Sequence, residues 1–346
     1  MRIGLVRRGY SPAGGAESYL RGFAQAALAA GHETVFFCSP EWQDWAFGEM
    51  IRVAGKSPRA FSDQLAALRP KEKCDVLFSL ERVSQCDFYR AGDGVHAAWL
   101  KRRAEFESPL RRLTFAFNPK HRALLRLEKE SITGARCVIA NSEMVRREIA
   151  ENYGSSIRVE VVRNGIDPLK WAVPSECREA LRKRFELQPN DRVAVFVGSG
   201  WERKGLRFAI AAAREAGCIL LVSGKGHAES FHAPQVRFLG PTDQVADVLH
   251  AADAFILPTI YDPFSNATLE ALAAGLPIIT TTANGVSEIL DPESDGTAVT
   301  SPGDVSALAA ALKRWLPDQN TAIRQSHGSR FTLERNFAET LRIIES

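Results

Sequence analysis

The chain has 346 residues, of which 45% are hydrophobic and 25% are charged. This length favours two α/β domains of ordinary size, and the composition is typical of a soluble globular enzyme. No apolar run reaches the length of about 18 residues that a membrane-spanning helix needs, and the opening Met1–Arg8 indicates a first strand rather than a secretory signal. The six cysteines include no Cys-x-x-Cys pair, so we expect buried, reduced thiols and no zinc site.

Strand-like and helix-like segments alternate along the chain, which predicts parallel α/β sheets. Strand candidates fall at 2–6, 34–38, 75–80, 137–141 and 158–163, and then at 193–198, 218–224, 236–240, 254–258, 277–281 and 297–300. The turn-rich segment 164–174 separates the two series. We predict two doubly wound, Rossmann-like domains over 1–165 and 166–331, followed by a last helix within 332–346. Such sheets bind ligands at the carboxyl ends of their strands, so we expect a central cleft that both domains face.

The first strand leads into a loop that carries the pair Gly14-Gly15 before a helix. Paired glycines let the backbone approach a ligand closely, and the N-terminus of a helix favours anions. Neither a Gly-x-Gly-x-x-Gly fingerprint nor a Walker lysine pattern is present, which disfavours an oxidoreductase. A tight structural turn is the alternative interpretation of this loop.

A second polar loop, at 89–96, contains Asp93 and His96 beside two glycines. Both side chains are candidates for contacting a sugar hydroxyl or an acceptor. A purely structural role for His96 is the alternative, and the residues do not decide between Asp93 and His96 as the active-site group.

The segment 97–126 is strongly basic and is also rich in Trp, Phe and Leu. Against two acidic residues it carries eight basic ones, a net charge of +6 in a chain whose total is +3: Lys101, Arg102, Arg103, Arg111, Arg112, Lys120, Arg122 and Arg126. Basic residues mixed with bulky apolar ones favour an anionic membrane surface, where each cation contributes about 1 kcal/mol. No nucleic-acid-binding module accompanies the patch, so nucleic acid is not expected. A solvated helical hairpin with its apolar stripe in the core is the alternative.

The glycine-rich turn 198–206 follows the first strand of the second domain and contains Gly200, Arg203 and Lys204. Two cations at the start of a helix add to its free N–H groups, so this turn is suited to neutralising a departing diphosphate without a metal. A pair of solvated basic residues is the alternative. Further along, the backbone around Phe238 is a candidate frame for a nucleotide base.

The segment 261–277 places two carboxylates, Asp262 and Glu270, at either end of a turn that becomes a helix. Ser265 or Asn266 is the expected N-cap, and the backbone N–H groups of 264–266 are expected to be free for an anion. Two surface acids on an ordinary strand-turn-helix are the alternative.

The spacing of these acids resembles the paired-acid motif of retaining glycosyltransferases of family 4, in which seven residues separate two acids. The likeness spans nearly the whole chain and is most specific over 193–290. It implies a GT-B fold in which the first domain binds the acceptor, the second binds the nucleotide sugar, and the helix within 332–346 packs back on the first domain. It also implies that Asp262 and the amides of Phe264, Ser265 and Asn266 lie at the donor sugar and Glu270 at the ribose. The first acid is Asp rather than the family's usual Glu, which shortens its reach.

The resemblance also implies a reaction. The pattern around 93–103 is similar to that of bacterial lipopolysaccharide core glucosyltransferases, which implies retaining transfer of a hexose from UDP-hexose to an envelope glycolipid or saccharide. Neither a cofactor nor a metal is expected, and the place of action would be the cytoplasmic face of the inner membrane, where the chain would bind peripherally. A sugar-nucleotide 2-epimerase and a non-catalytic nucleotide-sugar binding protein are the alternatives.

Overall fold

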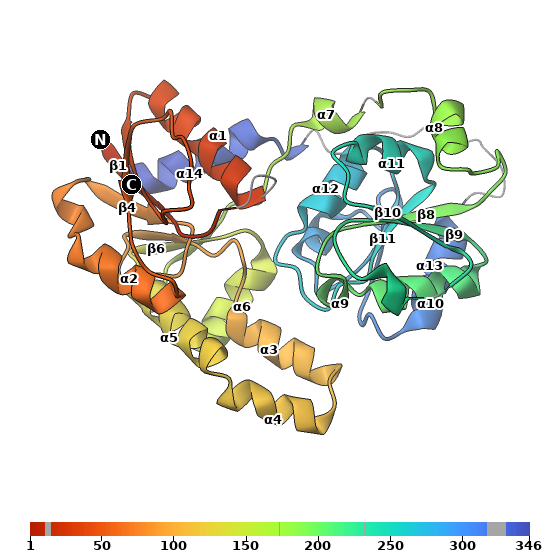
Figure 1. The fold of residues 1–346 in the computed structure, drawn as a ribbon, viewed down its shortest axis with the longest axis horizontal. Coiled ribbons are helices and arrows are strands. Elements are labelled where there is room, and N and C mark those ends of the chain that lie inside the picture. Colours follow the sequence, from red (N-terminus) through yellow and green to blue (C-terminus); the bar gives the residue numbers. More distant parts are fainter. Residues whose placement is uncertain (11–14, 173, 232, 317–329) are drawn as a thin grey trace. The chain divides into compact units, whose positions relative to one another are not determined.

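The computed structural model describes residues 1–10, 15–172, 174–231, 233–316 and 330–346. These residues form two compact units (Figure 1). The N-terminal unit comprises Met1–Gly165 together with Leu333–Ser346, and the C-terminal unit comprises Ile166–Thr332. Each unit holds one sheet whose described strands are all parallel, so the predicted class of two doubly wound, Rossmann-like domains is confirmed. The cleft expected between the domains stays a prediction.

The sheet of the N-terminal unit has the strand order β3-β2-β1-β4-β5-β6-β7. Its strands are β1 (Arg2–Arg7), β2 (Glu33–Cys38), β3 (Glu49–Arg52), β4 (Val76–Ser79), β5 (Phe88–Arg90), β6 (Cys137–Ala140) and β7 (Val159–Val161). β3 and β5 are not among the predicted strands, because charged residues interrupt their short apolar runs, Glu49 and Arg52 in β3 and Arg90 in β5. β5 nevertheless lies inside the sheet, between β4 and β6, and it carries the chain into the polar loop at 91–96.

The helices of the N-terminal unit begin at ordinary signals. They are α1 (Gly15–Ala29), α2 (Pro58–Ala67), α3 (His96–Glu105), α4 (Pro109–Phe117), α5 (Pro119–Gly134), α6 (Glu143–Tyr153) and α14 (Leu333–Glu345), with a 3-10 turn at Pro70–Glu72. Proline occupies the first position of α2, α4 and α5, where its missing N–H costs nothing.

The last helix, α14, packs against α1, at the other end of the chain (Figure 1). The Phe337 ring lies 5.4 Å from that of Tyr19 and 6.2 Å from that of Phe23. Asn336 Nδ2 also donates a hydrogen bond of 2.6 Å to the carbonyl of Arg163. Helix α14 therefore completes the hydrophobic core of the N-terminal unit from the far end of the chain.

The C-terminal unit has the strand order β10-β9-β8-β11-β12-β13. Its strands are β8 (Val193–Val197), β9 (Ile219–Ser223), β10 (Val236–Gly240), β11 (Ala254–Leu257), β12 (Ile278–Thr281) and β13 (Gly296–Val299). Its helices are α7 (Pro168–Ala172), α8 (Arg178–Arg184), α9 (Trp201–Lys204), α10 (Leu206–Ala216), α11 (Val245–Ala251), α12 (Asn266–Ala273) and α13 (Val305–Trp315), with 3-10 turns at Ala228–Ser230 and Gly285–Ile289.

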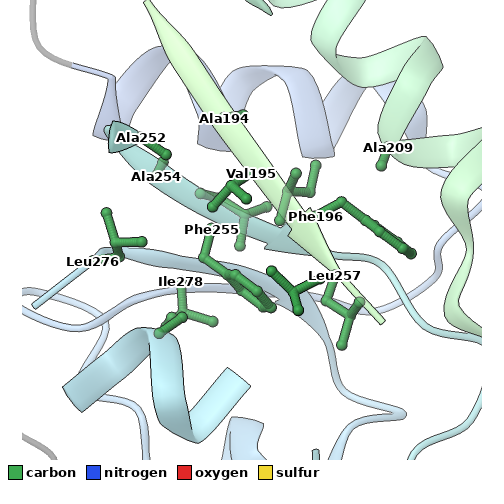
Figure 2. Packing of buried hydrophobic residues seen from close by; sticks show 14 of the residues in the cluster. Ala194, Val195, Phe196, Ala209, Ala252, Ala254, Phe255, Leu257, Leu276 and Ile278 are labelled. Carbon is green, nitrogen blue, oxygen red and sulfur yellow. The ribbon is translucent and has the colours of Figure 1, made fainter. Parts of the chain in front are cut away.

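The core of the C-terminal unit is built from strands that are apolar on both faces, as buried parallel strands are. Figure 2 shows Phe255 of β11 beside Ile278 of β12, the residue with which it is paired in the sheet. Helix α10 packs against α13 and buries mainly alanines, which allows close approach. This rigid layer holds the loops that leave the carboxyl ends of β8, β11 and β12.

The cysteine prediction holds for five of the six residues, which are free and buried. Cys177, at the N-cap of α8, is exposed and corrects the expectation that all are buried, because the short helix α8 carries it at the surface. None of the helices in the described residues has the length and apolar character needed to cross a membrane.

Candidate functional site

The turn after β8 is shaped by its glycines. Gly200 has a φ of 73° and Gly205 a φ of 79°, both in the left-handed region, and the single helical turn α9 lies between them. A Cβ on Gly205 would stand 1.9 Å from the carbonyl oxygen of Pro258, so only glycine lets this turn approach the end of β11. The two predicted cations, Arg203 and Lys204, end α9 and directly precede α10.

Lys204 and Asp262, predicted separately as a diphosphate ligand and a sugar ligand, are joined in one ion pair. Lys204 Nζ donates a hydrogen bond to Asp262 Oδ2, and the two side chains are only 11% and 8% exposed. The backbone of Asp262 is fixed on both sides, because its N–H donates to Ala283 and its carbonyl accepts from Gly285, each at 2.9 Å. The fold therefore brings together two charges that are 58 positions apart in the sequence.

Arg203 connects the ends of β8 and β11. Its Nη1 donates a hydrogen bond of 2.9 Å to the carbonyl of Tyr261. Its own carbonyl accepts from the N–H of Ile260 at 2.9 Å and from Thr259 Oγ1 at 3.0 Å. Arg203 is thus half-buried and preorganised beside the Lys204–Asp262 pair.

The start of α12 resolves the alternative between two N-caps in favour of Ser265, whose Oγ accepts from the N–H of Thr268 at 3.3 Å. The expectation of free N–H groups over 264–266 is wrong at Ser265, because its N–H donates to Asn284 Oδ1 at 3.3 Å. The reason is burial: Phe264 and Ser265 are buried, and buried backbone groups take partners inside the protein. Asn266 is the exposed member of the three.

Asn284 is a residue of this site that the sequence analysis missed. Its side chain is completely buried and bonded at both ends. Nδ2 donates to Thr268 Oγ1 at 3.1 Å and to Thr280 Oγ1 at 3.0 Å, and Oδ1 accepts from the N–H groups of Ser265 and Val286. Asn284 therefore positions the start of α12 against β12. The available signal was an Asn-Gly pair that begins three residues after the end of the predicted strand 277–281.

Glu270 lies one turn inside α12 and is half-buried. Burial raises the pKa of its carboxyl group to about 7, although the positive charges of Lys170 and Lys204 act in the opposite direction. Lys204 thus acts electrostatically on both predicted acids. In the residues that the structure describes, no three His, Cys, Asp or Glu side chains gather as metal ligands.

The predicted base frame at Phe238 has an aromatic partner that the sequence analysis did not name. The ring of Trp201 lies 5.4 Å from that of Phe238, with 34° between their planes. Trp201 Nε1 donates to the carbonyl of Gly198 at 2.9 Å, and a Cβ on Gly226 would meet the indole at 2.3 Å. Trp201 therefore packs the ends of β8, β9 and β10 together. Its place in a glycine-rich turn was the available signal.

In the N-terminal unit, the structure covers one of the two predicted glycines. Gly15 is the first residue of α1 and is exposed, whereas Gly14 lies outside the described residues. Asp93 has a side chain that is 65% exposed and lies 3.9 Å from Arg82 Nη1. His96 begins α3, and its Nε2 lies 3.0 Å from Nδ1 of His121 on α5. Burial lowers the pKa of His96 to about 4, so it is neutral near pH 7.

Glu128 holds this loop in place and was also not predicted. Its carboxylate is fully buried and accepts hydrogen bonds from the N–H groups of His96 and Ala97, from Arg82 Nε at 3.0 Å and from the Tyr153 hydroxyl at 2.6 Å. The anion thus caps the N-terminus of α3 and compensates a buried guanidinium. No sequence pattern indicates it, because its partners come from three separate segments.

The basic segment 97–126 spans most of α3, all of α4 and the first half of α5. Part of its charge is compensated within the chain: Arg102 pairs with Glu148 at 2.9 Å, and Arg103 and Arg111 pair with Glu107. The apolar side chains divide as well. Most are half-buried, but two on α4, Leu110 and Phe117, are each 79% exposed. The apolar stripe is therefore not wholly in the core.

Comparison with known proteins gives matches along nearly the whole chain. The protein-family model described as "Glycosyltransferase Family 4" matches residues 13–169. The protein-family model described as "Glycosyl transferases group 1" matches residues 191–318. A "Probable transglycosylase" of Burkholderia thailandensis is 30% identical over 324 residues, which are 90% of this chain and 85% of that protein. A glycogen synthase of Mycobacterium tuberculosis is 32% identical over 217 residues, 58% of this chain, and the matched region spans only half of the synthase.

Several solved structures share the fold along nearly the full chain, and WaaG and HepE are two of them. WaaG, a glycosyltransferase involved in lipopolysaccharide biosynthesis, superposes with a TM-score of 0.75 at 21% identity, covering 99% of this chain and 94% of WaaG. Anabaena Alr3699/HepE, in complex with UDP-glucose, has a TM-score of 0.73 at 19% identity, covering 99% of this chain and all of HepE. At these identities the likeness bears on the fold alone.

Proposed function

This chain belongs to glycosyltransferase family 4, and on that premise we propose that it transfers a hexose, with glucose as the first candidate, from UDP-hexose to an envelope glycolipid or lipopolysaccharide core acceptor. The transfer retains the configuration at the anomeric carbon and needs no metal. The observation that carries the proposal is the meeting of Lys204, Arg203 and Asp262 at the carboxyl ends of neighbouring strands. The UDP-glucose complex of the structural neighbour HepE supports the choice of donor.

Each group in the C-terminal unit has a distinct role in this proposal. Arg203 and Lys204 neutralise the diphosphate as it departs, because preorganised cations in a dry site stabilise developing charge strongly. The carboxylate of Asp262 accepts hydrogen bonds from hydroxyl groups of the donor sugar, and that of Glu270 accepts them from the ribose hydroxyl groups. When the diphosphate takes Lys204, the carboxylate of Asp262 loses its partner and becomes available to the sugar.

The chemical step in this proposal is the one that the resemblance to retaining glycosyltransferases of family 4 implies. The proposed acceptor hydroxyl attacks on the face from which the diphosphate leaves, and an oxygen of that diphosphate takes the hydroxyl proton. Lys204 and Arg203 carry the charge of the leaving group during this step. Asp262 is ion-paired in the free protein, which disfavours it as a nucleophile of the glycosidase kind.

The test is a pair of incubations with UDP-glucose, one without an acceptor and one with lipopolysaccharide core from a strain lacking glucosyl transfer. Glucose should appear on the acceptor, with the α configuration of the donor seen by NMR. Conversion of the sugar nucleotide without an acceptor would replace the proposal by a 2-epimerase. Tight UDP-glucose binding without turnover on any acceptor would favour a binding protein.

Placement of the acceptor at a membrane is the second part of the proposal. Leu110 and Phe117 expose apolar side chains on α4, and Arg112 is a neighbouring cation that is exposed. Exposed apolar groups flanked by cations favour an interface rich in anionic lipid. We therefore expect the chain to act at the cytoplasmic face of the inner membrane and to bind there peripherally.

Co-sedimentation with vesicles of phosphatidylglycerol and phosphatidylethanolamine tests this part. The variant Leu110→Ser/Phe117→Ser should lose binding without loss of thermal stability, because both side chains already face solvent. Leu169→Ser is the matched control, since Leu169 is equally exposed on α7. Sedimentation of the double variant at the wild-type level, or of none of the proteins, would remove the membrane role.

A further inference from the structure

The carboxyl edge of the N-terminal sheet carries an arginine at or just beyond each of three neighbouring strands. Arg7 ends β1, Arg82 follows β4, and Arg90 ends β5. Two of these cations have carboxylate partners. Arg7 lies 3.8 Å from Glu17 and 3.6 Å from Glu81, and Arg82 is bonded to Glu128.

Arg90 differs from the other two in its environment. The residue is 5% exposed, and within the described parts of the chain no carboxylate oxygen lies within 4.0 Å of its guanidinium. One face of the guanidinium lies 4.1 Å from the centre of the Tyr19 ring. Nη2 donates to Asn164 Oδ1 at 2.8 Å, whereas Nη1 is shielded from solvent and has no hydrogen-bond partner.

This arrangement is costly unless something negative completes it. A buried charge is normally paired, and a buried donor without an acceptor destabilises the folded protein, more so when the donor is charged. A ring face and a neutral amide oxygen hold the guanidinium in place but supply no counter-charge. A guanidinium with one free N–H edge is the donor group that phosphate and carboxylate oxygens bind best.

We infer that Arg90 binds a phosphate or carboxylate group of the acceptor. The side chain of Arg90 runs beside Gly92, where an added Cβ would stand 3.8 Å from Nε, and Gly92 leads directly to Asp93. The anion would therefore be held next to the loop predicted to face the acceptor. The inference rests on the proposed function, since it names the chemical class of that enzyme's acceptor.

The test compares three hexoses titrated calorimetrically into the full chain at constant ionic strength: glucose 6-phosphate, glucuronate and glucose. Saturating UDP is present, so that Arg203 and Lys204 do not take up the phosphate group. At least one anionic sugar should bind wild type roughly ten- to a hundredfold more tightly than glucose, as a hydrogen bond to a charged group allows. The phosphate and carboxylate arms also identify which anion the acceptor carries.

Arg90→Gln should remove this preference for an anionic sugar while leaving UDP affinity unchanged. Arg90→Lys keeps the positive charge but not the paired N–H donors of the guanidinium, so it should keep part of the preference. Arg192→Gln is the matched control, because Arg192 also has an unpartnered Nε but lies before β8 in the other unit. Equal binding of all three sugars to wild type, or an unchanged preference in Arg90→Gln, would overturn the inference. Failure of wild type to bind UDP would instead count against the proposed function, so the two failures are distinct.

Discussion

The substitution Asp262→Asn tests whether binding of the donor breaks the buried ion pair between Lys204 and Asp262. In the free protein Lys204 Nζ is held by Asp262, and both side chains are about nine-tenths buried, with exposures of 11% and 8%. Asn keeps the size of Asp but removes its charge. Lys204 would then be a buried cation without a counter-charge in the absence of ligand.

The expected cost follows from this burial. Removing one partner of a buried pair destabilises a protein by about 3–5 kcal/mol. For a domain of 150–250 residues this corresponds to a fall in melting temperature of about 6–20 °C. At the same time Lys204 no longer has to leave a carboxylate, so affinity for free UDP should rise, by about tenfold if one charged hydrogen bond is gained. Transfer should nevertheless decline, because the donor sugar loses the Asp262 carboxylate as its hydrogen-bond acceptor.

Differential scanning fluorimetry and calorimetric titration with UDP measure the two effects on the same samples. Lys204→Met and Lys204→Met/Asp262→Asn complete a double-mutant cycle, and we expect the double variant to melt above Asp262→Asn because no buried charge is left alone. The explanation fails if Asp262→Asn melts within about 1 °C of wild type and binds UDP no more tightly.

Three further outcomes follow from the same site. Arg203→Ala should lower turnover about a hundredfold or more, as removal of one donor from a preorganised anion site does, whereas Arg207→Ala, an exposed neighbour, should leave turnover near wild type in the same assay. Because the pKa of Glu270 is about 7 instead of its ordinary 4.5, its ionisation opposes folding as the pH rises. The melting temperature of Glu270→Gln minus that of wild type should therefore increase between pH 4.5 and 7. A difference that stays constant or decreases over this range would contradict the raised pKa. Asn284→Ala should cost about 1–3 kcal/mol for each buried partner left unbonded, whereas the exposed Thr282→Ala should cost little in the same urea titration.

The amino-acid sequence by itself determined the fold class. Alternating apolar strands and amphipathic helices specify two parallel sheets, because each element must bury its own apolar face and shows this need locally. Proline at the start of α2 and serine at the N-cap of α12 are likewise local signals. The short strands β3 and β5 were not predicted from the sequence, since their place in the sheet depends on neighbouring strands rather than on their own few residues.

The tertiary structure alone decided how the charges are arranged. Nothing in the sequence pairs Lys204 with Asp262, makes Asn284 the support of α12, or leaves Arg90 without a carboxylate, because each depends on which strand ends become neighbours. Residue types and turn signals locate the loops that carry the chemistry. The partners of each charge come from segments far apart in the chain, and burial, which fixes the energy of those pairings, exists only once both sheets are formed.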